Sequence, residues 1–540
     1  MKKKSIAAVT FLCLILHITE SYAQKYPAKK IIDVQSYKFE ISVNDSNDSL
    51  VGAATIQFNV LEETLNLKFD LASVRGNGRG MIVTSVFEGG KNLMFNHEHD
   101  QVRINFPVTL KPGEEHTILI SYRGIPADGL IISKNKYNHR TFFADNWPNR
   151  AHHWLACIDH PSDKATVEFI VQAPVHYQVI ANGVKVEEIN LSPQQKLTHF
   201  REVVPLPMKV AVIGIAAFAV QQAGVVDGIP VESWVYPEDR QKGFSDYAQA
   251  LEVLPFFTRM IAQYPYKKLA NVQSKTIFGG MENAGAIFYF ENSVTGKHEM
   301  EALLAHEIAH QWFGDMATET HWSHVWLSEG FATYLTHLYL EHKYGPDSLR
   351  KRMAEDRQAI IGFSKRKTGP VVDSTVSNYM DLLNVNSYQK GGWVLHMLRN
   401  AVGDSIFWRG LRSYYNKFAG RNASTEDFQK IMEDQSRQDL KQFFRQWLYT
   451  PGIPALSIQW TYDTQRRSLI VTINQQQKQL FQLPLTIRIQ LADDTVINRT
   501  VAIKEQQTIL ALPAASRPKS VIADPGVVML FDGSVKEVSR

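Results

Sequence analysis

Hydrophobic and polar residues alternate along much of the first 224 positions of this chain. Period-two segments at residues 37–43, 54–60 and 117–122 are bounded by Asn, Asp, Gly and Pro, which favour turns. Alternation of this kind is typical of strands with one buried face and one exposed face. The pattern therefore predicts a large antiparallel β platform over residues 24–224.

The spacing of the apolar positions changes to a helical period at about residue 225. Helices are expected at residues 247–263, 394–401 and 407–418. The segment Ser424-Thr425-Glu426-Asp427 has the composition of a capped helix start. Residues 225–451 are therefore predicted to form a mainly helical domain.

Alternation returns after Pro451 and continues to the end, as at residues 456–460 and 469–473. Strands over fewer than 100 residues are enough for a small β-sandwich, which we expect at residues 452–540. The sequence as a whole thus predicts a multidomain α+β protein with a β-rich, a helical and a second β-rich part.

The first 23 residues have the three regions of a secretory signal peptide. Lys2, Lys3 and Lys4 form a basic start, residues 6–18 are mostly apolar, and Ser21-Tyr22-Ala23 provides a small-x-small cleavage site. The apolar run is shorter than the roughly 20 residues of a membrane span. We therefore expect a protein exported to the periplasm or secreted, with no membrane span after removal of this signal.

Charge and cysteine content narrow the possible partners. Without the signal the chain has 55 basic and 53 acidic residues, so composition gives no support for nucleic acid or an anionic membrane as partner. Cys157 is then the one remaining cysteine, so no intrachain disulfide can form. Stability is expected to come from buried cores, and no pattern predicts an oligomeric state.

One stretch has the residues of a metal site. His306 and His310 lie four positions apart in a segment of helical period that ends at Gly314. Residues four apart share one face of a helix, so both imidazoles can point at the same ion. Glu307 is rotated by about 100° from His306, so it faces the open side of that ion, where it can act as a base.

A third ligand follows nineteen positions after His310. Glu329 lies beside a second run of helical period, so it is expected near the start of the next helix. Two imidazoles and one carboxylate form a set that binds catalytic Zn²⁺ and leaves a fourth position for water. We therefore expect one zinc ion held by His306, His310 and Glu329. Thr333, one turn further on, is either a hydroxyl that orients Glu329 or a core-facing or capping residue.

A glycine-rich segment precedes the metal helix. It reads Gly279-Gly280-Met281-Glu282-Asn283-Ala284-Gly285 and follows a strand-like run at residues 270–278. Glycines let the main chain approach an extended ligand closely, as when a peptide adds to a sheet edge. Glu282 is then either a carboxylate beside the metal cleft or a solvated loop charge.

With both motifs, the sequence closely resembles the zinc aminopeptidases of the aminopeptidase N and leukotriene hydrolase family. The resemblance rests on the Gly-x-Met-Glu-Asn segment at 279–283, the zinc set, and Tyr388 in Tyr388-Gln389-Lys390-Gly391. It implies a thermolysin-like catalytic domain under an N-terminal β saddle. It also implies that Glu282 grips the α-ammonium of the substrate and that Tyr388, otherwise an ordinary buried aromatic, stabilises the tetrahedral intermediate.

The sequence departs from the family pattern in two places. The family usually has a Glu or Gln about ten to twelve residues before the Cys157 position as a second ammonium anchor, and residues 145–147 contain neither. Asp145 is the candidate substitute. The sequence also stops after the expected β-sandwich, where many relatives continue into a long helical domain, so a more open cleft is expected.

These features together predict a zinc-dependent aminopeptidase. It would release N-terminal amino acids from peptides with a free N-terminus, with Glu307 as general base and Tyr388 stabilising the intermediate. An endopeptidase with the same metal chemistry is the first alternative. A secreted peptide-binding or assembly module with a retired site is the second, and the intact metal and base residues argue against it.

Overall fold

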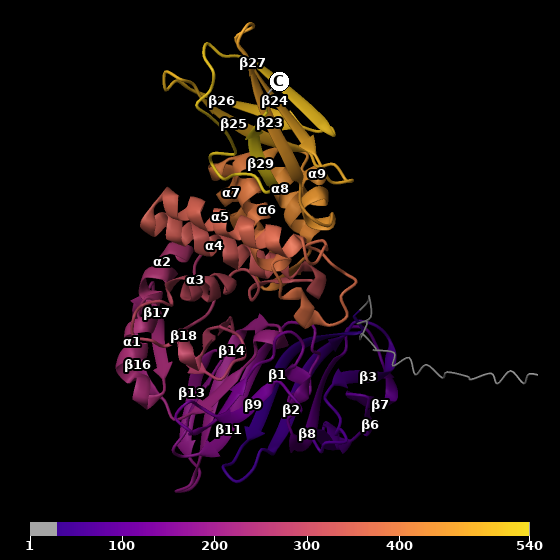
Figure 1. Cartoon of the computed structure of the whole chain (residues 1–540). Helices are drawn as coiled ribbons and strands as arrows, with labels where there is room; N and C mark the ends of the chain where they lie inside the picture. The colour runs from indigo at the N-terminus through magenta and orange to yellow at the C-terminus, as the bar shows by residue number, and fades with distance from the viewer. Residues whose placement is uncertain (1–29, 539–540) are drawn as a thin grey trace, which may run out of the picture.

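The computed structural model describes residues 30–538 of the 540-residue chain. The predicted signal peptide, residues 1–23, lies outside the described residues. Figure 1 shows a β platform at one end, helices in the middle and a second group of strands at the C-terminal end. The expected multidomain α+β architecture, with β-rich, mainly helical and β-rich parts in that order, is confirmed.

The β platform is built around one eight-stranded sheet. Its strands in spatial order are β13 (Val184–Asn190), β14 (Gln195–Leu206), β11 (Ala165–Pro174), β1 (Ile32–Ser42), β2 (Leu50–Val60), β8 (Glu115–Ile125), β4 (Gly80–Glu88) and β5 (Lys91–Asn92). Side chains alternate along β1, where Phe39 and Ile41 are buried and Glu40 is exposed. The pairing differs from the expected antiparallel pattern in one place, because β1 and β11 run parallel.

Two smaller sheets complete the platform. The first contains β3 (Thr64–Asp70), β7 (Gln101–Leu110) and β6 (Met94–Glu98). The second contains β12 (Gln178–Ala181), β15 (Ile213–Ala216), β10 (Arg140–Ala144) and β9 (Leu130–Lys134). The chain leaves β10 into the loop that begins at Asp145, and this loop reaches the middle part of the molecule.

The middle part begins with a five-stranded sheet. Its order is β16 (Ala219–Val226), β17 (Ile229–Val235), β18 (Leu269–Ser274), β20 (Ala286–Phe290) and β19 (Gly280–Met281). The domain boundary expected at residue 224 lies inside β16, which pairs with β17. β19 is an edge strand of this sheet, and it lies within the glycine-rich segment 279–285. A short sheet of β21 (Ala317–Glu319) and β22 (Arg421–Ala423) lies further along the chain.

Helices form the rest of the middle part. They are α1 (Arg240–Tyr247), α2 (Ala250–Met260), α3 (Glu301–His310), α4 (Trp326–Tyr344), α5 (Pro346–Ser364), α6 (Gly391–Val402), α7 (Asp404–Phe418), α8 (Thr425–Ser436) and α9 (Lys441–Phe444). The helices expected from periodicity correspond to α2, α6 and α7. Ser424 caps α8 as expected, since its hydroxyl accepts from the main-chain nitrogen of Asp427 while the Asp427 carboxylate accepts from that of Ser424.

The C-terminal strands form two sheets. One contains β27 (Gln507–Pro513), β24 (Ser468–Gln475), β23 (Ala455–Asp463) and β29 (Asp532–Glu537). The other contains β26 (Val496–Ile503), β25 (Leu483–Gln490) and β28 (Ser520–Ala523). Arg357 of α5 pairs with Asp524, which follows β28, so the helices and the C-terminal sheets are joined by an ion pair whose carboxylate is fully buried.

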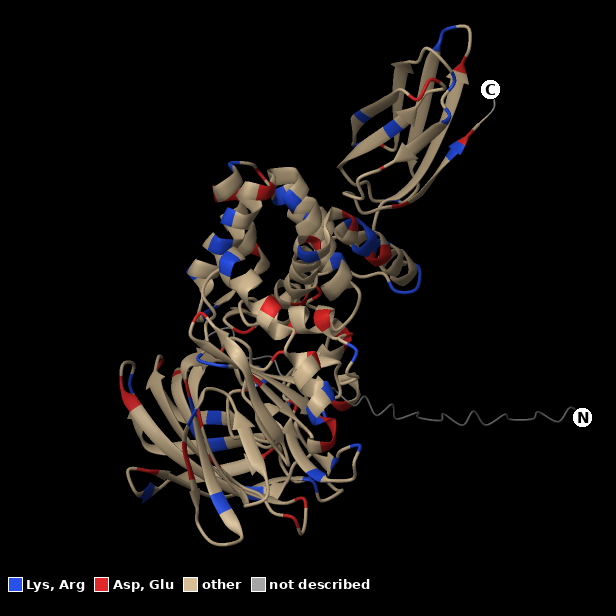
Figure 2. Cartoon of the chain, turned by 90° about the vertical axis from the view of Figure 1, so that its left-hand side faces the viewer, with Lys and Arg blue, Asp and Glu red and all other residues tan. Residues whose placement is uncertain are grey.

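Charged residues of both signs are interspersed over all three parts in the view of Figure 2. Among residues 30–538, no helix combines the length and the apolar character needed to cross a bilayer.

Candidate metal centre and cleft

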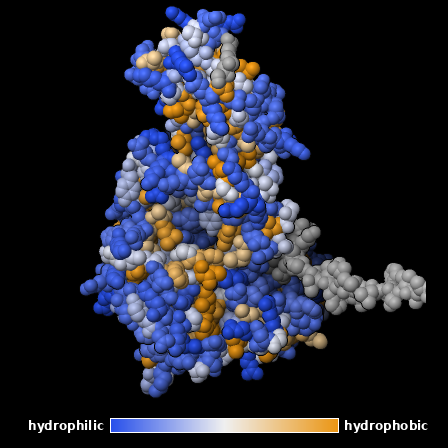
Figure 3. Space-filling model, in the orientation of Figure 1, coloured by the Kyte–Doolittle hydropathy of each residue, from blue (hydrophilic) through white to orange (hydrophobic). Residues whose placement is uncertain are grey.

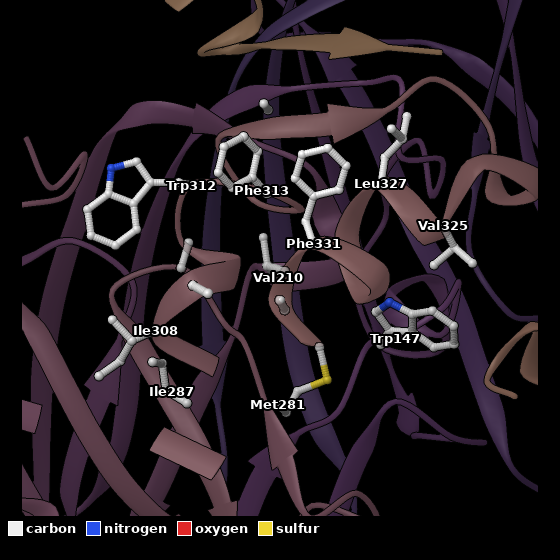
Figure 4. Close-up of a cluster of buried hydrophobic side chains, with 14 of the residues drawn as sticks. Trp147, Val210, Met281, Ile287, Ile308, Trp312, Phe313, Val325, Leu327 and Phe331 are labelled. Atoms are coloured by element: carbon white, nitrogen blue, oxygen red, sulfur yellow. The ribbon is translucent and has the colours of Figure 1, made fainter. Parts of the chain in front are cut away.

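The helix that carries the two histidines is held in place by its buried back face. Ile308 of α3 and Trp312 just beyond its end are fully buried (Figure 4). Phe313 packs against Phe331 of α4, with 4.9 Å between the ring centroids. The apolar residues thus press α3 against α4 and leave the face that carries His306 toward the cleft.

Three donor atoms converge between α3 and α4. Nε2 of His306 and Nε2 of His310 are 3.1 Å apart. Oε2 of Glu329 lies 3.4 Å from the first of these atoms and 3.2 Å from the second. Glu329 is in the first turn of α4, as the apolar period predicted. Local helix geometry therefore brings together the two histidines, and the packing of α3 on α4 adds the carboxylate.

The spacing of these donors fits a small tetrahedral cation. Zinc binds imidazole nitrogen and carboxylate oxygen at about 2.0–2.1 Å, which separates neighbouring donors by about 3.3 Å. The three separations in the structure, 3.1, 3.2 and 3.4 Å, lie around that value. Oε2 of Glu329 is also buried without a hydrogen-bond partner among the described residues. The set of His306, His310 and Glu329 therefore fits a zinc ion.

A residue that the sequence did not reveal orients His310. The Ser328 hydroxyl lies 3.0 Å from Nδ1 of His310, and the main-chain oxygen of Phe313 lies 3.2 Å from the same atom. A Cβ at Gly314, where φ is +124°, would stand 2.2 Å from that hydroxyl, so only glycine fits there. Thr333 lines the cleft and forms no hydrogen bond within residues 30–538, so its hydroxyl orients no metal ligand.

Glu307 faces the cleft from the next position along α3. It is only 4% exposed, and a Cβ at Gly280 would stand 2.3 Å from its Oε1. Glycine is therefore what allows the edge strand to pass so close to this carboxylate. Burial raises the pKa of Glu307 well above its ordinary value, while His310 opposes the rise and the carboxylates of Glu282 and Glu329 add to it. A carboxyl with a raised pKa is suited to taking up and returning a proton near neutral pH.

Glu282 directly follows β19 and is a buried carboxylate without a full set of partners. One of its carboxylate oxygens lies within 4.8 Å of a donor atom of Glu307 and of one of His310, and its Oε1 has no hydrogen-bond partner among the described residues. Burial raises the pKa of Glu282, against the influence of His310 and Lys209. Its main-chain oxygen accepts from Nε2 of Gln311, which fixes the turn after β19. A positively charged donor would satisfy the unpartnered oxygen.

The glycine-rich segment provides an open edge beside these carboxylates. Gly280 and Met281 pair with β20 on one side, and β19 is the last strand of its sheet. Gly279, Gly280 and Met281 all line the cleft. Asn283 does not line it, since its side chain is fully buried and its amide atoms have no hydrogen-bond partner among the described residues. The edge is therefore free for an extended ligand along residues 279–281.

Tyr388 lies over His306. Its ring stacks on His306 at 6.0 Å between centroids with an interplanar angle of 13°. It belongs to a π-helical turn, Asn386–Lys390, of a kind that is frequent at functional sites. Burial raises the pKa of Tyr388 well above its ordinary value, and the carboxylates of Glu329 and Glu282 add to it. The phenol therefore keeps its proton and is a hydrogen-bond donor at the cleft.

The structure corrects the expectation for Asp145. Its Oδ1 accepts from Arg150 at 2.7 Å, and its Oδ2 accepts from the Thr276 hydroxyl at 3.1 Å and the Ile277 main-chain nitrogen at 3.0 Å. Asp145 is fully buried and does not line the cleft. It fastens the loop after β18 to the platform instead of offering an ammonium anchor. Trp147, two positions further on, is the residue of this loop that does line the cleft.

The cleft itself has a volume of about 480 Å³. Figure 3 shows a hollow at the junction of the β platform and the helices. Residues from α3, α4, α5, β19 and the π-helical turn line the cleft, together with Trp147 from the platform loop. No signal in the sequence marked His337, Arg352 and Asp356 as cleft residues, because their approach depends on how separate elements pack.

A cleft with a His-His-Glu donor set, a nearby carboxyl of raised pKa and an open sheet edge has the arrangement of a zinc-dependent peptidase. Comparison with known proteins agrees with this class. The peptidase M1 N-terminal domain matches residues 34–208, and the peptidase family M1 domain matches residues 246–447. The chain therefore belongs to peptidase family M1.

Individual relatives match at moderate identity. Probable aminopeptidase 2 of Sulfurisphaera tokodaii is 28% identical over 403 residues, which cover 70% of this chain and 50% of that protein. Aminopeptidase M1-A of Oryza sativa subsp. japonica is 25% identical over 67% of this chain and 43% of its own length. Glutamyl aminopeptidase of Rattus norvegicus is 24% identical over 80% of this chain and 49% of its own length. The chain spans about half the length of these relatives.

Proposed function

We propose that this protein is an exported zinc aminopeptidase that releases N-terminal amino acids from peptides. The observation that carries the proposal is the convergence of His306, His310 and Glu329 beside an unpartnered, buried Glu282 carboxylate. The names of the relatives, which include probable aminopeptidase 2 and glutamyl aminopeptidase, support the same class of reaction.

The metal and the base have separate tasks in this proposal. Zinc held by His306, His310 and Glu329 would supply Lewis acidity, which polarises a peptide carbonyl and lowers the pKa of water. Glu307 takes a proton from the attacking water, because its raised pKa makes it a competent acceptor near neutral pH. It then returns the proton to the leaving amine. Tyr388 donates its phenolic hydrogen to the carbonyl oxygen as negative charge develops there.

Glu282 gives the proposal its exopeptidase character. An α-ammonium group is the kind of donor that satisfies the unpartnered Oε1, and the edge of β19 aligns the peptide main chain beside it. A peptide with a blocked N-terminus leaves this buried carboxylate without a donor, which is energetically costly. Cleavage is therefore expected one residue from the N-terminus.

A set of aminoacyl fluorogenic amides tests the proposed activity. The zinc-loaded protein is expected to cleave several of them, to lose activity in a chelator and to regain it on addition of Zn²⁺. Failure to cleave any aminoacyl amide in the zinc-loaded state would overturn the proposal.

The Glu282→Ala variant tests the anchor. We expect it to weaken kcat/KM for aminoacyl amides by ~10² or more, because a charge-assisted contact to the ammonium is lost. N-acetylated analogues, which cannot make this contact, should be affected far less. Glu299→Gln, at an exposed position before α3, is the matched control. Equal losses on both substrate types in Glu282→Ala would refute the anchor.

A further inference from the structure

One end of the cleft carries a positively charged side chain that has no acidic partner. Arg352 of α5 lines the cleft and makes no hydrogen bond or ion pair with a residue in the range 30–538. Its neighbours on α5 are paired: Arg350 with Asp347, Lys351 with Glu355, and Arg357 with Asp524. Among these four basic side chains of α5, the unpaired one, Arg352, is the one that lines the cleft.

The acidic cleft residue on the same helix already has a hydrogen-bond partner. Asp356 lies one turn beyond Arg352 on α5, and its Oδ2 is 2.8 Å from Nε2 of His337. No ion pair joins Arg352 to Asp356. Nδ1 of His337 is buried and has no hydrogen-bond partner among the described residues. The guanidinium of Arg352 is therefore available to a ligand at this end, whereas the buried imidazole nitrogen is not.

The residues of α4 that line the cleft show where the Arg352 end lies relative to the metal site. Glu329, Thr333 and His337 are spaced by four residues, so they follow one face of the helix and all line the cleft. Eight residues of α-helix span about 12 Å. Arg352 and His337 therefore lie roughly two helical turns beyond the ligand Glu329, toward the middle of α4.

Glu282 lies toward the other end of α4. One of its carboxylate oxygens lies within 4.8 Å of a ring nitrogen of His310. Nδ1 of His310 is 3.0 Å from the hydroxyl of Ser328, which is in the first turn of α4. The proposed ammonium site and Arg352 are thus on opposite sides of the metal ligands.

We propose that Arg352 binds a carboxylate of the substrate on the leaving-group side of the cleaved bond. The inference rests on the proposed aminopeptidase function, because the peptide then runs from Glu282 past the metal toward Arg352. An extended chain advances about 3.3 Å per residue, so the carboxylate lies two to three residues beyond the cleaved bond. It is either the C-terminus of a tripeptide or tetrapeptide, or the side chain of Asp or Glu in a longer peptide. A guanidinium binds either source through paired, charge-assisted hydrogen bonds.

Matched tripeptides with a free C-terminal carboxylate and with a C-terminal amide test this proposal. Wild type is expected to prefer the free acid by ~10-fold or more in kcat/KM, mostly through KM. Arg352→Gln should abolish this preference. Arg350→Gln, about half a helical turn away on the exposed side of α5, should keep it. If the ratio of kcat/KM for the free acid to that for the amide is the same in wild type and in Arg352→Gln, for tripeptides and tetrapeptides alike, Arg352 does not bind the C-terminal carboxylate.

A second pair of substrates separates the two sources of the carboxylate. C-terminally amidated hexapeptides with Glu or Gln at the third or fourth position offer a side-chain carboxylate only. A preference for Glu that disappears in Arg352→Gln assigns the site to acidic side chains, and a preference restricted to the short free acids assigns it to the C-terminus. If neither preference depends on Arg352, the inference is wrong.

Aminoacyl fluorogenic amides, which have no residue beyond the cleaved bond, separate this inference from the proposed function. Wild type should cleave them whether or not Arg352 has the proposed role. If neither protein cleaves them, the proposed function fails. If both cleave them and the carboxylate preferences are equal, only the role of Arg352 fails. If Arg352→Gln instead alters selectivity between N-terminal Glu and Gln, Arg352 contacts the first residue and the proposal is overturned.

Discussion

Three buried carboxylates share the cleft, and their neighbours give them different protonation behaviour. Burial opposes ionisation of Glu329, but His310 and His306 hold its pKa below the usual range. Burial raises the pKa values of Glu307 and Glu282 instead. Groups whose environments push their pKa values apart are suited to separate roles in one reaction. This contrast supports Glu329 as a ligand and Glu307 as the group that carries the proton.

The Glu307→Gln variant tests that division of roles. We expect it to keep a full equivalent of zinc and to lose ~10² to 10⁴ in kcat, because the amide cannot accept the proton. Zinc content and kcat on the best aminoacyl amide are the measurements, with Glu299→Gln as the control. Activity within a few-fold of wild type would remove Glu307 as the base.

At this scale the sequence predicted what short-range geometry decides. His306, Glu307 and His310 follow from the pitch of a helix, so their positions could be read from spacing alone. The prediction that Asp145 anchors the substrate ammonium was wrong, because Arg150 and the loop at Thr276 contact Asp145 only in the folded chain. Ser328 was missed for a related reason, since its contact with His310 depends on the close packing of two helices.

At the scale of elements, the buried side chain of Asp163 lies where β1 pairs with β11, and its ionisation makes the free energy of unfolding depend on pH. Tyr37 of β1 donates to Oδ2 of Asp163, just before β11, and Lys30 lies 3.6 Å from Oδ1. Burial raises the pKa of Asp163 from 3.8 to about 7, although Lys30 opposes this. The folded state therefore holds this proton more tightly than the unfolded state.

The sign of the pH dependence follows directly. Because the folded pKa is raised, the stability from this group is fully present below about pH 4 and is lost as the pH rises through 7. Asp163→Asn removes the ionisation, so its unfolding free energy relative to wild type should rise by ~3 kcal/mol between pH 4 and pH 8. Denaturant titrations at both pH values measure this change.

Glu40→Gln, at an exposed site on β1, is the control for that titration. A difference between wild type and Asp163→Asn that is the same at pH 4 and pH 8 would contradict the raised pKa.

The periodicity of apolar residues predicted the α-helices but not the π-helical turn. α3 and α4 follow from apolar residues at helical spacing, and the capped start of α8 follows from Ser424 and Asp427. The π-helical turn at Asn386–Lys390 had no such signal, because it is fixed by packing against α4, α5 and α6. The position of β19 at a sheet edge was suggested by its glycines, while the strand order needed the structure.

At the scale of the whole molecule, α5 links the cleft to the C-terminal sheets. Arg352 on this helix lines the cleft, and Arg357, five residues on, pairs with the fully buried side chain of Asp524. The guanidinium of Arg357 also lies 5.0 Å from the ring of Trp393 and 5.2 Å from that of Phe531. The order of the three parts could be predicted from changes of periodicity, but this connection between them could not.

Arg357→Met is expected to weaken the joint between the helices and the C-terminal sheets. The change leaves Asp524 buried without its cation, which typically costs ~3 kcal/mol. The midpoint of thermal unfolding should fall clearly, and the double variant Arg357→Met/Asp524→Asn should recover part of the loss. Lys351→Met, at an exposed position of α5, is the control. An unchanged midpoint in Arg357→Met would show that this pair does not hold the two parts together.

The most direct test of the account is a mass-spectrometric time course with one ten-residue peptide and its N-acetylated twin. The zinc-loaded protein should shorten the free peptide one residue at a time from its N-terminus and leave the acetylated twin intact. Fragments from internal cleavage, or equal cleavage of both peptides, would contradict a cleft in which Glu282 holds the N-terminus beside the metal.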